Sequence, residues 1–225
     1  MAFSFRPSAK DLEVGSNGGC TAAPFFTRKQ VAQIIELAKE PYRTLYILAW
    51  GTGMRAGEIL ALTVSDLDFE RKTIRVNKAA DDRTRAIRQP KTNKSVASLP
   101  MTNSLAHVLQ NYLARSWKQN QAGLLFPNRA GERPRSRKSV LKNSLKPILR
   151  KLGIPENGCG LHAFRHGLAT ELAESCVPIT VLQQQMRHAD VKTTLRVYAH
   201  AIPESQRDAM ERASIGTRRF RYGET

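Results

Sequence analysis

The 225-residue chain has few cysteines, no long apolar runs and few acidic residues, and each shortage excludes a class of protein. Its three cysteines, Cys20, Cys159 and Cys176, are odd in number and lack metal-ligand spacing, so we expect reduced thiols and no metal site. No run approaches the roughly 20 apolar residues of a membrane span, and no signal peptide opens the chain. We therefore expect a cytoplasmic protein without a membrane segment.

The shortage of acidic residues leaves a strongly basic chain. Nineteen Asp and Glu face 36 Lys and Arg, which gives a formal net charge of +17. Such an excess costs self-repulsion in the compact state, and a polyanionic partner is the usual reason for it. Nucleic acid is the first candidate, ahead of an anionic membrane or a merely basic surface.

Apolar periodicity predicts a mainly α fold with one small antiparallel β-sheet (α+β). Residues 1–24 lack that periodicity and resemble a linker or disordered lead-in. Helices are expected from Thr27, after Pro41, across AGEILAL and from Asn103. Further helices are expected over 137–152, 162–175, 178–187, 190–199 and 204–213. KTIRV and SVASL have strand composition, and the basic connection between them leaves room for a middle strand.

Four stretches carry residues suited to chemistry. TGMRAGEILAL contains Arg55 with Glu58 three positions later, and QPKTNKSVASLP contains Lys91. LHAFRHGLAT contains His162 and Arg165, which share a helix face. HADVKTTLRVYAH contains His188 and Tyr198. Taken singly, each has an ordinary explanation, such as a helical ion pair for Arg55 or aromatic packing for Tyr198.

Together these residue types form a phosphoryl-transfer set. Two arginines can fork onto phosphodiester oxygens and offset charge in the transition state. A histidine can take a proton, a tyrosine can be the covalent nucleophile, and a lysine can protonate the departing oxygen. Guanidinium charge then occupies the place that Mg²⁺ has in polymerases, so we expect no metal and no cofactor. Asp66 and Asp68 are interpreted as turn residues rather than ligands.

The four stretches, in this order, resemble the tyrosine recombinases, or phage-type integrases, over about Thr27 to Ala213. HAFRH matches the H-x-x-R-H box, and HADVKTTLRVYAH resembles the closing H-x-x-x-x-T-T-x-x-Y-x-H. The resemblance implies the tyrosine recombinase catalytic-domain fold and a site-specific DNA recombinase acting through a 3′-phosphotyrosine. It implies six catalytic residues: Arg55, Lys91, His162, Arg165, His188 and Tyr198. Glu58 is implied as the accessory acidic residue, and Lys91 is the least secure because Lys94 lies nearby.

Two features depart from the family pattern. Met186 and Arg187 stand where Leu-Gly usually precedes the histidine of the third box, and glycine there favours a tight helix end. Residues 1–24 are also too few to supply the usual N-terminal DNA-clamping domain. We therefore expect residues 25–202 to form a catalytic domain, and the chain to be a fragment of a longer integrase or a minimal member.

The resemblance implies double-stranded DNA as partner, a monomer that becomes a homo-tetramer on DNA, and a prokaryotic host. Residues 203–225 are expected to form a helix and basic tail, which packs on its own domain or on a neighbouring protomer. Two other functions stay open: a type IB topoisomerase-like relaxase, and a DNA-binding accessory protein without catalysis. The expected DNA-tracking residues are Arg83, Arg85, Arg88, Lys94, Arg135, Arg137 and Lys138.

Overall fold

The computed structural model describes residues 24–89, 96–187, 192, 194 and 195. The chain divides into two compact units, Met1–Leu168 and Ala169–Thr225. Within the described residues, the structure is largely helical with small antiparallel sheets, so the predicted fold class is confirmed. No helix in this part of the chain has both the length and the apolar character to cross a membrane.

The helices of the first unit begin near the positions expected from the sequence. They are α1 (Arg28–Leu37), α2 (Tyr42–Thr52), α3 (Ala56–Ala61), α4 (Asn103–Arg115), α5 (Arg137–Val140), α6 (Lys146–Leu152) and the start of α7 (Leu161–Glu174). Thr27 caps α1 in a capping box: its hydroxyl accepts from the Gln30 N–H at 3.3 Å, and Gln30 Oε1 accepts from the Thr27 N–H at 2.9 Å. Local sequence is therefore sufficient to begin these helices.

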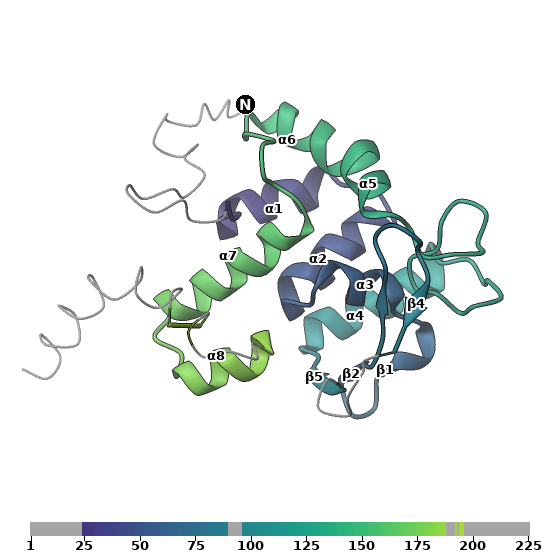
Figure 1. The fold of residues 1–225 in the computed structure, drawn as a ribbon, viewed down its shortest axis with the longest axis horizontal. Coiled ribbons are helices and arrows are strands. Elements are labelled where there is room, and N and C mark those ends of the chain that lie inside the picture. Colours follow the sequence, from purple (N-terminus) through teal and green to yellow (C-terminus); the bar gives the residue numbers. More distant parts are fainter. Residues whose placement is uncertain (1–23, 90–95, 188–191, 193, 196–225) are drawn as a thin grey trace, which may run out of the picture. The chain divides into compact units, whose positions relative to one another are not determined.

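One helical run differs from the expected continuous helix. Between α5 and α6, residues Leu141–Leu145 form a π-helical turn. Pro147 follows two residues after this turn, and a proline inside a helix lacks the N–H donor and clashes with the carbonyl four residues earlier. The wider turn accommodates this proline, so α5, the π turn and α6 still run consecutively (Figure 1).

The strands form two separate sheets rather than one. β1 (Leu67–Asp68), β2 (Thr73–Val76) and β5 (Ala97–Pro100) make an antiparallel sheet in the order β1-β2-β5. β3 (Ala79–Ala80) and β4 (Ile87–Arg88) make a separate hairpin, and only β4 lies in the basic connection where a middle strand was expected. This hairpin lies beside α3 (Figure 1) because Gly57 of α3 has no side chain. A Cβ there would lie 2.8 Å from the Ala80 carbonyl oxygen.

Asp66 is more than the turn residue that we expected. Its side chain is 1% exposed and forms an ion pair with Lys78 at 2.6 Å. It also accepts from the Thr63 N–H at 2.8 Å and the Thr63 hydroxyl at 2.7 Å. A buried carboxylate is tolerated when its charge is paired and its oxygens are hydrogen-bonded. This cluster joins the end of α3 to the segment between β2 and β3.

The second unit contains the end of α7 and α8 (Ile179–Met186). Arg187 ends α8 with φ 50° and ψ 47°, the left-handed conformation that glycine would adopt without strain. The arginine therefore keeps the tight helix end despite the departure from Leu-Gly. Thr194, in the closing box, is fully buried. The helices expected over 190–199 and 204–213 otherwise lie outside the described residues.

Candidate active site

The first arginine lies at the turn between α2 and α3. α2 ends when Gly53 adopts a left-handed conformation with φ 64°, and the Thr52 hydroxyl donates to the Leu48 carbonyl at 2.6 Å. Met54 is then buried, and Arg55 has the extended backbone of a helix N-cap. The turn thus buries the methionine and leaves the Arg55 side chain half exposed.

Glu58 holds Arg55 through both backbone and side chain. One carboxylate oxygen accepts from the Arg55 N–H at 2.7 Å, and the other pairs with Arg55 Nη1 at 3.2 Å. The same carboxylate lies in the first turn of α3, where negative charge is favoured. The helical ion pair and the accessory role predicted for Glu58 are therefore compatible, because the pair orients the guanidinium.

The second arginine, Arg165, stands 110 positions after Arg55 in the sequence. Arg165 of α7 is 8% exposed, and its Nη1 donates to the carbonyl of Gly53. Gly53 stands two residues before Arg55, so both predicted arginines reach the same turn. Since both residues belong to the first unit, this juxtaposition arises within one compact body. It is the central feature of the site.

Aromatic packing and one glycine hold the start of α7 in place. Phe164 stacks on Tyr46 of α2, with ring centroids 5.1 Å apart, and meets Phe26 edge-on at 4.9 Å. Gly167 lies against the chain before α1: a Cβ there would overlap the Phe26 carbonyl oxygen and lie 2.9 Å from Trp50 Cζ3. Our sequence prediction did not include Gly167, although it follows the H-x-x-R-H box directly.

The two histidines of this box have different surroundings. His162 is exposed, and its ring lies edge-on to that of His166, with centroids 5.9 Å apart. His166 is half buried; this burial, with smaller contributions from the charges of His162 and Arg165, lowers its pKa. The lowered pKa favours the neutral form of His166, whereas the side chain of His162 is exposed to solvent.

Three predicted catalytic residues, Lys91, His188 and Tyr198, lie outside the described residues, as does Lys94. Cys159 is buried, and this burial raises the pKa of its thiol, so a nucleophilic role is disfavoured despite the nearby His162. Among the described residues, no group of three or more His, Cys, Asp or Glu side chains could hold a metal ion.

The described DNA-tracking candidates differ in how they are held. Arg88 pairs with Asp81 at 3.2 Å, and Arg137 pairs with Asp82 at 3.6 Å. Such exposed pairs contribute about 0–1 kcal/mol, so a phosphate can displace them at little cost. Arg83 and Lys138 are exposed, whereas Arg85 and Arg135 are half buried. Arg85 and Arg135 are therefore more covered by the rest of the protein than the sequence indicated.

A basic α+β domain that brings two arginines to one turn has the features of an enzyme that acts on phosphodiesters. Comparison with known proteins makes the assignment specific. The model of the phage integrase family matches residues 24–205, most of the chain. The chain therefore belongs to the phage integrase family, which confirms the resemblance drawn from the four boxes.

The curated relatives have recombinase names. A tyrosine recombinase XerC-like protein of Caldanaerobacter subterraneus subsp. tengcongensis is 30% identical over 209 residues, covering 83% of this chain and 52% of its own length. Tyrosine recombinase XerA of Pyrococcus furiosus is 29% identical over 189 residues, covering 83% and 59%. The chain thus spans little more than half the length of these relatives.

Solved structures agree with the fold. The Tn1549 transposon integrase in complex with circular intermediate DNA has a TM-score of 0.72 and 27% identity, covering 87% of this chain and 68% of that chain. The XerA recombinase has a TM-score of 0.64 at 22% identity, covering 92% and 68%, which supports the fold alone.

Proposed function

We propose that this chain is the catalytic domain of a site-specific DNA recombinase that cuts and rejoins strands through a 3′-phosphotyrosine. The observation that carries the proposal is that Arg165 bonds the carbonyl of Gly53, two residues before Arg55 in the α2–α3 turn. Two guanidinium groups at one turn match the non-bridging oxygens of a phosphodiester. The recombinase names of the relatives, and the DNA complexes of the Tn1549 integrase, point to the same substrate.

The described tyrosines support Tyr198 as the nucleophile by elimination. The chain has five tyrosines. Tyr46 is fully buried, and burial raises its pKa far above the ordinary value. Tyr112 donates its hydroxyl to the Leu125 carbonyl at 3.1 Å, and burial raises its pKa to about 12. Tyr42 accepts from Arg135. None of the other four tyrosines lies in one of the four boxes, whereas Tyr198 lies in the closing box.

The proposed reaction is balanced without a cofactor. The Tyr198 oxygen attacks the scissile phosphorus, and His162 takes the phenolic proton. The bond to the 5′ oxygen breaks, and Lys91 protonates that oxygen to leave a 5′-hydroxyl. Arg55, Arg165 and His188 offset the charge on the phosphate, while Glu58 orients Arg55. A 5′-hydroxyl from a partner strand then reverses the step and releases the tyrosine.

The experiment is covalent trapping on a pool of nicked duplexes with randomised sequence. The nick lets the short 5′-hydroxyl strand diffuse away, so the phosphotyrosine accumulates as an adduct that survives SDS. Sequencing the trapped DNA identifies the site. We expect Tyr198→Phe to form no adduct and the matched control Tyr222→Phe to form as much as wild type. Adduct formation by Tyr198→Phe would remove Tyr198 from this role.

We further propose a monomer in solution and a tetramer on two DNA sites, in the cytoplasm of a prokaryotic host. The catalytic domain would cover residues 25–202, and the segment 203–225 would dock on a neighbouring protomer. Deleting 203–225 is then expected to weaken synapsis more than it weakens folding. Synapsis is measured by the gel mobility of paired duplexes, and folding by the melting temperature of the protein. Equal loss of synapsis and folding would place the segment on its own domain instead. Strand exchange between two trapped duplexes, rather than relaxation of any supercoiled DNA, separates a recombinase from a relaxase.

A further inference from the structure

A second group of arginines surrounds a cavity outside the proposed active site. Arg85, Arg129 and Arg135 line a hollow of about 270 Å³ that includes neither Arg55 nor Arg165. They come from the β3–β4 hairpin, from the loop after Phe126 and from the residue before the Ser136 cap of α5. Tyr42, Ser139 and Asn143 also line it, so hydroxyl and amide groups accompany the guanidinium groups.

The hairpin turn holds Arg85 in an uncommon conformation. The Asp81 carboxylate accepts from the N–H groups of Arg83 and Thr84, at 3.0 and 2.8 Å, and the Arg85 N–H donates to the Asp81 carbonyl at 2.9 Å. Arg85 itself has φ 59°, the left-handed region that long side chains rarely adopt. Backbone strain of this kind persists only where surrounding contacts impose it, and such positions cluster at ligand sites.

Arg135 is fixed by an aromatic ring but keeps an unsatisfied donor. Its guanidinium lies 5.2 Å from the centre of the Tyr42 ring, and Nη1 donates to the Tyr42 hydroxyl at 3.1 Å. Its Nε is buried and makes no hydrogen bond within the part of the chain that the structure describes. A buried donor of this kind costs free energy until a ligand or water satisfies it.

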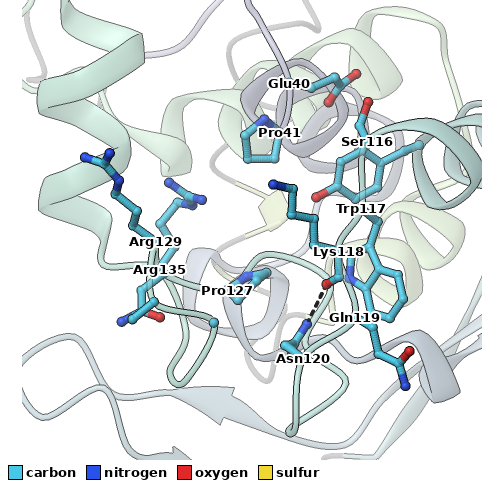
Figure 2. Close-up of a pocket in the computed structure, with 14 residues that line it drawn as sticks. Glu40, Pro41, Ser116, Trp117, Lys118, Gln119, Asn120, Pro127, Arg129 and Arg135 are labelled. Atoms are coloured by element: carbon cyan, nitrogen blue, oxygen red, sulfur yellow. Dashed lines mark hydrogen bonds between the residues drawn. The ribbon is translucent and has the colours of Figure 1, made fainter.

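No carboxylate among the described residues forms an ion pair with these three arginines. None of the residues that line the hollow is acidic. The two carboxylates of the hairpin, Asp81 and Asp82, pair with Arg88 and Arg137. Arg129 and Arg135 also border a neighbouring pocket, where Figure 2 shows them across from Trp117. That pocket contains Glu40, but its carboxylate accepts from the Thr44 N–H and hydroxyl, at 3.3 and 3.0 Å.

Three guanidinium groups around one hollow repel one another unless an anion lies between them. The planar donors of arginine match phosphate oxygens, and serine hydroxyls add neutral donors. We propose that this cavity binds a single phosphodiester of the DNA backbone, in addition to the scissile phosphate. The identity of the ligand rests on the proposed function, because that function makes DNA the substrate. A phosphate contact of this kind positions the DNA without reading its sequence.

The test is the salt dependence of duplex binding, measured by fluorescence anisotropy over a NaCl series with two duplexes of unrelated sequence. Arg85→Asn removes the charge while keeping a residue that tolerates left-handed backbone. We expect it to reduce the slope of log K against log[NaCl] on both duplexes by up to about 1, because Arg129 and Arg135 still face the same phosphate. Arg85→Asn combined with Arg135→Gln should reduce the slope by no more than about 1 in total, because both arginines share one phosphate.

Two further variants separate the cavity from general surface charge. Arg115→Ala removes an exposed arginine at the end of α4, outside the cavity, and should leave the slope unchanged. Ser139→Ala should weaken binding about 2- to 10-fold without changing the slope, since it removes a hydrogen bond and no charge. Thermal melts accompany each variant, and Arg85→Asn without DNA should melt no lower than wild type because it relieves repulsion.

Three outcomes would overturn the proposal. One is an Arg85→Asn slope equal to that of Arg115→Ala, and another is a double variant that loses about 2 from the slope. The third combines two results. Inorganic phosphate at matched ionic strength raises the melting temperature of wild type more than that of Arg85→Asn, but wild type and Arg85→Asn have the same slope of log K against log[NaCl] for DNA. That result would indicate a free-anion site. The adduct assay with Tyr198→Phe is a separate measurement, so loss of the proposed function is distinguishable from loss of this site.

Discussion

Gly167→Ala tests whether the close approach of α7 to its neighbours positions Arg165. A Cβ at residue 167 would overlap the Phe26 carbonyl oxygen and lie 2.9 Å from Trp50 Cζ3. Neither neighbour is the flexible end of a long side chain, so the backbone of α7 must move away. Arg165 lies on the same helix two residues earlier, and its bond to the Gly53 carbonyl depends on where that helix lies.

The expected magnitude combines two opposing effects. Alanine in place of glycine favours a helix by roughly 0.5–1 kcal/mol, whereas overpacking a buried contact costs about 1–3 kcal/mol. Because the overlap here is with backbone, we take the upper part of that range and expect a net loss of about 2 kcal/mol. For a domain of this size that is a melting temperature about 4–8 °C lower. A displacement of the arginine by about 1 Å reduces cleavage roughly 100-fold.

Gly51→Ala is the matched control, because it makes the same substitution in α2. A Cβ there would meet only Leu105 Cδ2, at an ordinary 3.6 Å. We expect it to raise the melting temperature, in line with a gain of roughly 0.5–1 kcal/mol. Thermal melts and single-turnover cleavage of a nicked duplex, at a temperature where both variants are folded, provide the two readouts. The reasoning is wrong if Gly167→Ala melts at or above wild type, or if it melts lower but cleaves at the wild-type rate.

Three other predictions concern the same region. Arg165→Lys replaces the planar donor that bonds the Gly53 carbonyl, and single-turnover cleavage should fall about 10²- to 10³-fold with a much smaller change in the Kd for DNA; equal losses would indicate a binding role only. The lowered pKa of His166 means that the unfolded chain takes up this proton first as pH falls below about 6.5. Stability should therefore decrease between that pH and the lower folded pKa, and urea midpoints at pH 7.5 and 5.5 should differ less in His166→Gln than in wild type. Cys176 is exposed and Cys159 is buried with a raised pKa, so a thiol reagent should modify Cys176 in the native protein and Cys159 only after unfolding, as mass spectrometry would report. Rapid native modification of Cys159 would contradict the structure.

Local features were predictable from the sequence because the residues that cause them are neighbours. α1 begins after its cap Thr27 and α2 begins after Pro41, as expected from the sequence. The helix over 137–152 is present, but its π turn was not foreseen because it depends on Pro147 inside the run. Arg187 keeps the left-handed helix end that glycine usually supplies, so this departure changes the residue and leaves the turn unchanged.

Several roles depended on contacts between distant segments. Asp66 resembled a turn residue in the sequence, whereas in the structure it forms a buried ion pair with Lys78. Gly57 and Gly167 resembled ordinary helical glycines, yet each lies against the backbone of another segment. The DNA-tracking arginines looked equivalent in the sequence, whereas Arg85 and Arg135 line a common cavity and Arg88 and Arg137 lie in surface ion pairs.

The sequence by itself determined the family, the helix starts and the residue types of the site, because these depend on spacing and local hydrogen bonds. Only the tertiary structure decided that Arg165 bonds the carbonyl at the turn carrying Arg55. It also decided that a second set of arginines faces one hollow. The physical reason is that packing of Phe164 on Tyr46, and the missing side chain of Gly167, set the position of α7 through contacts more than 100 residues apart.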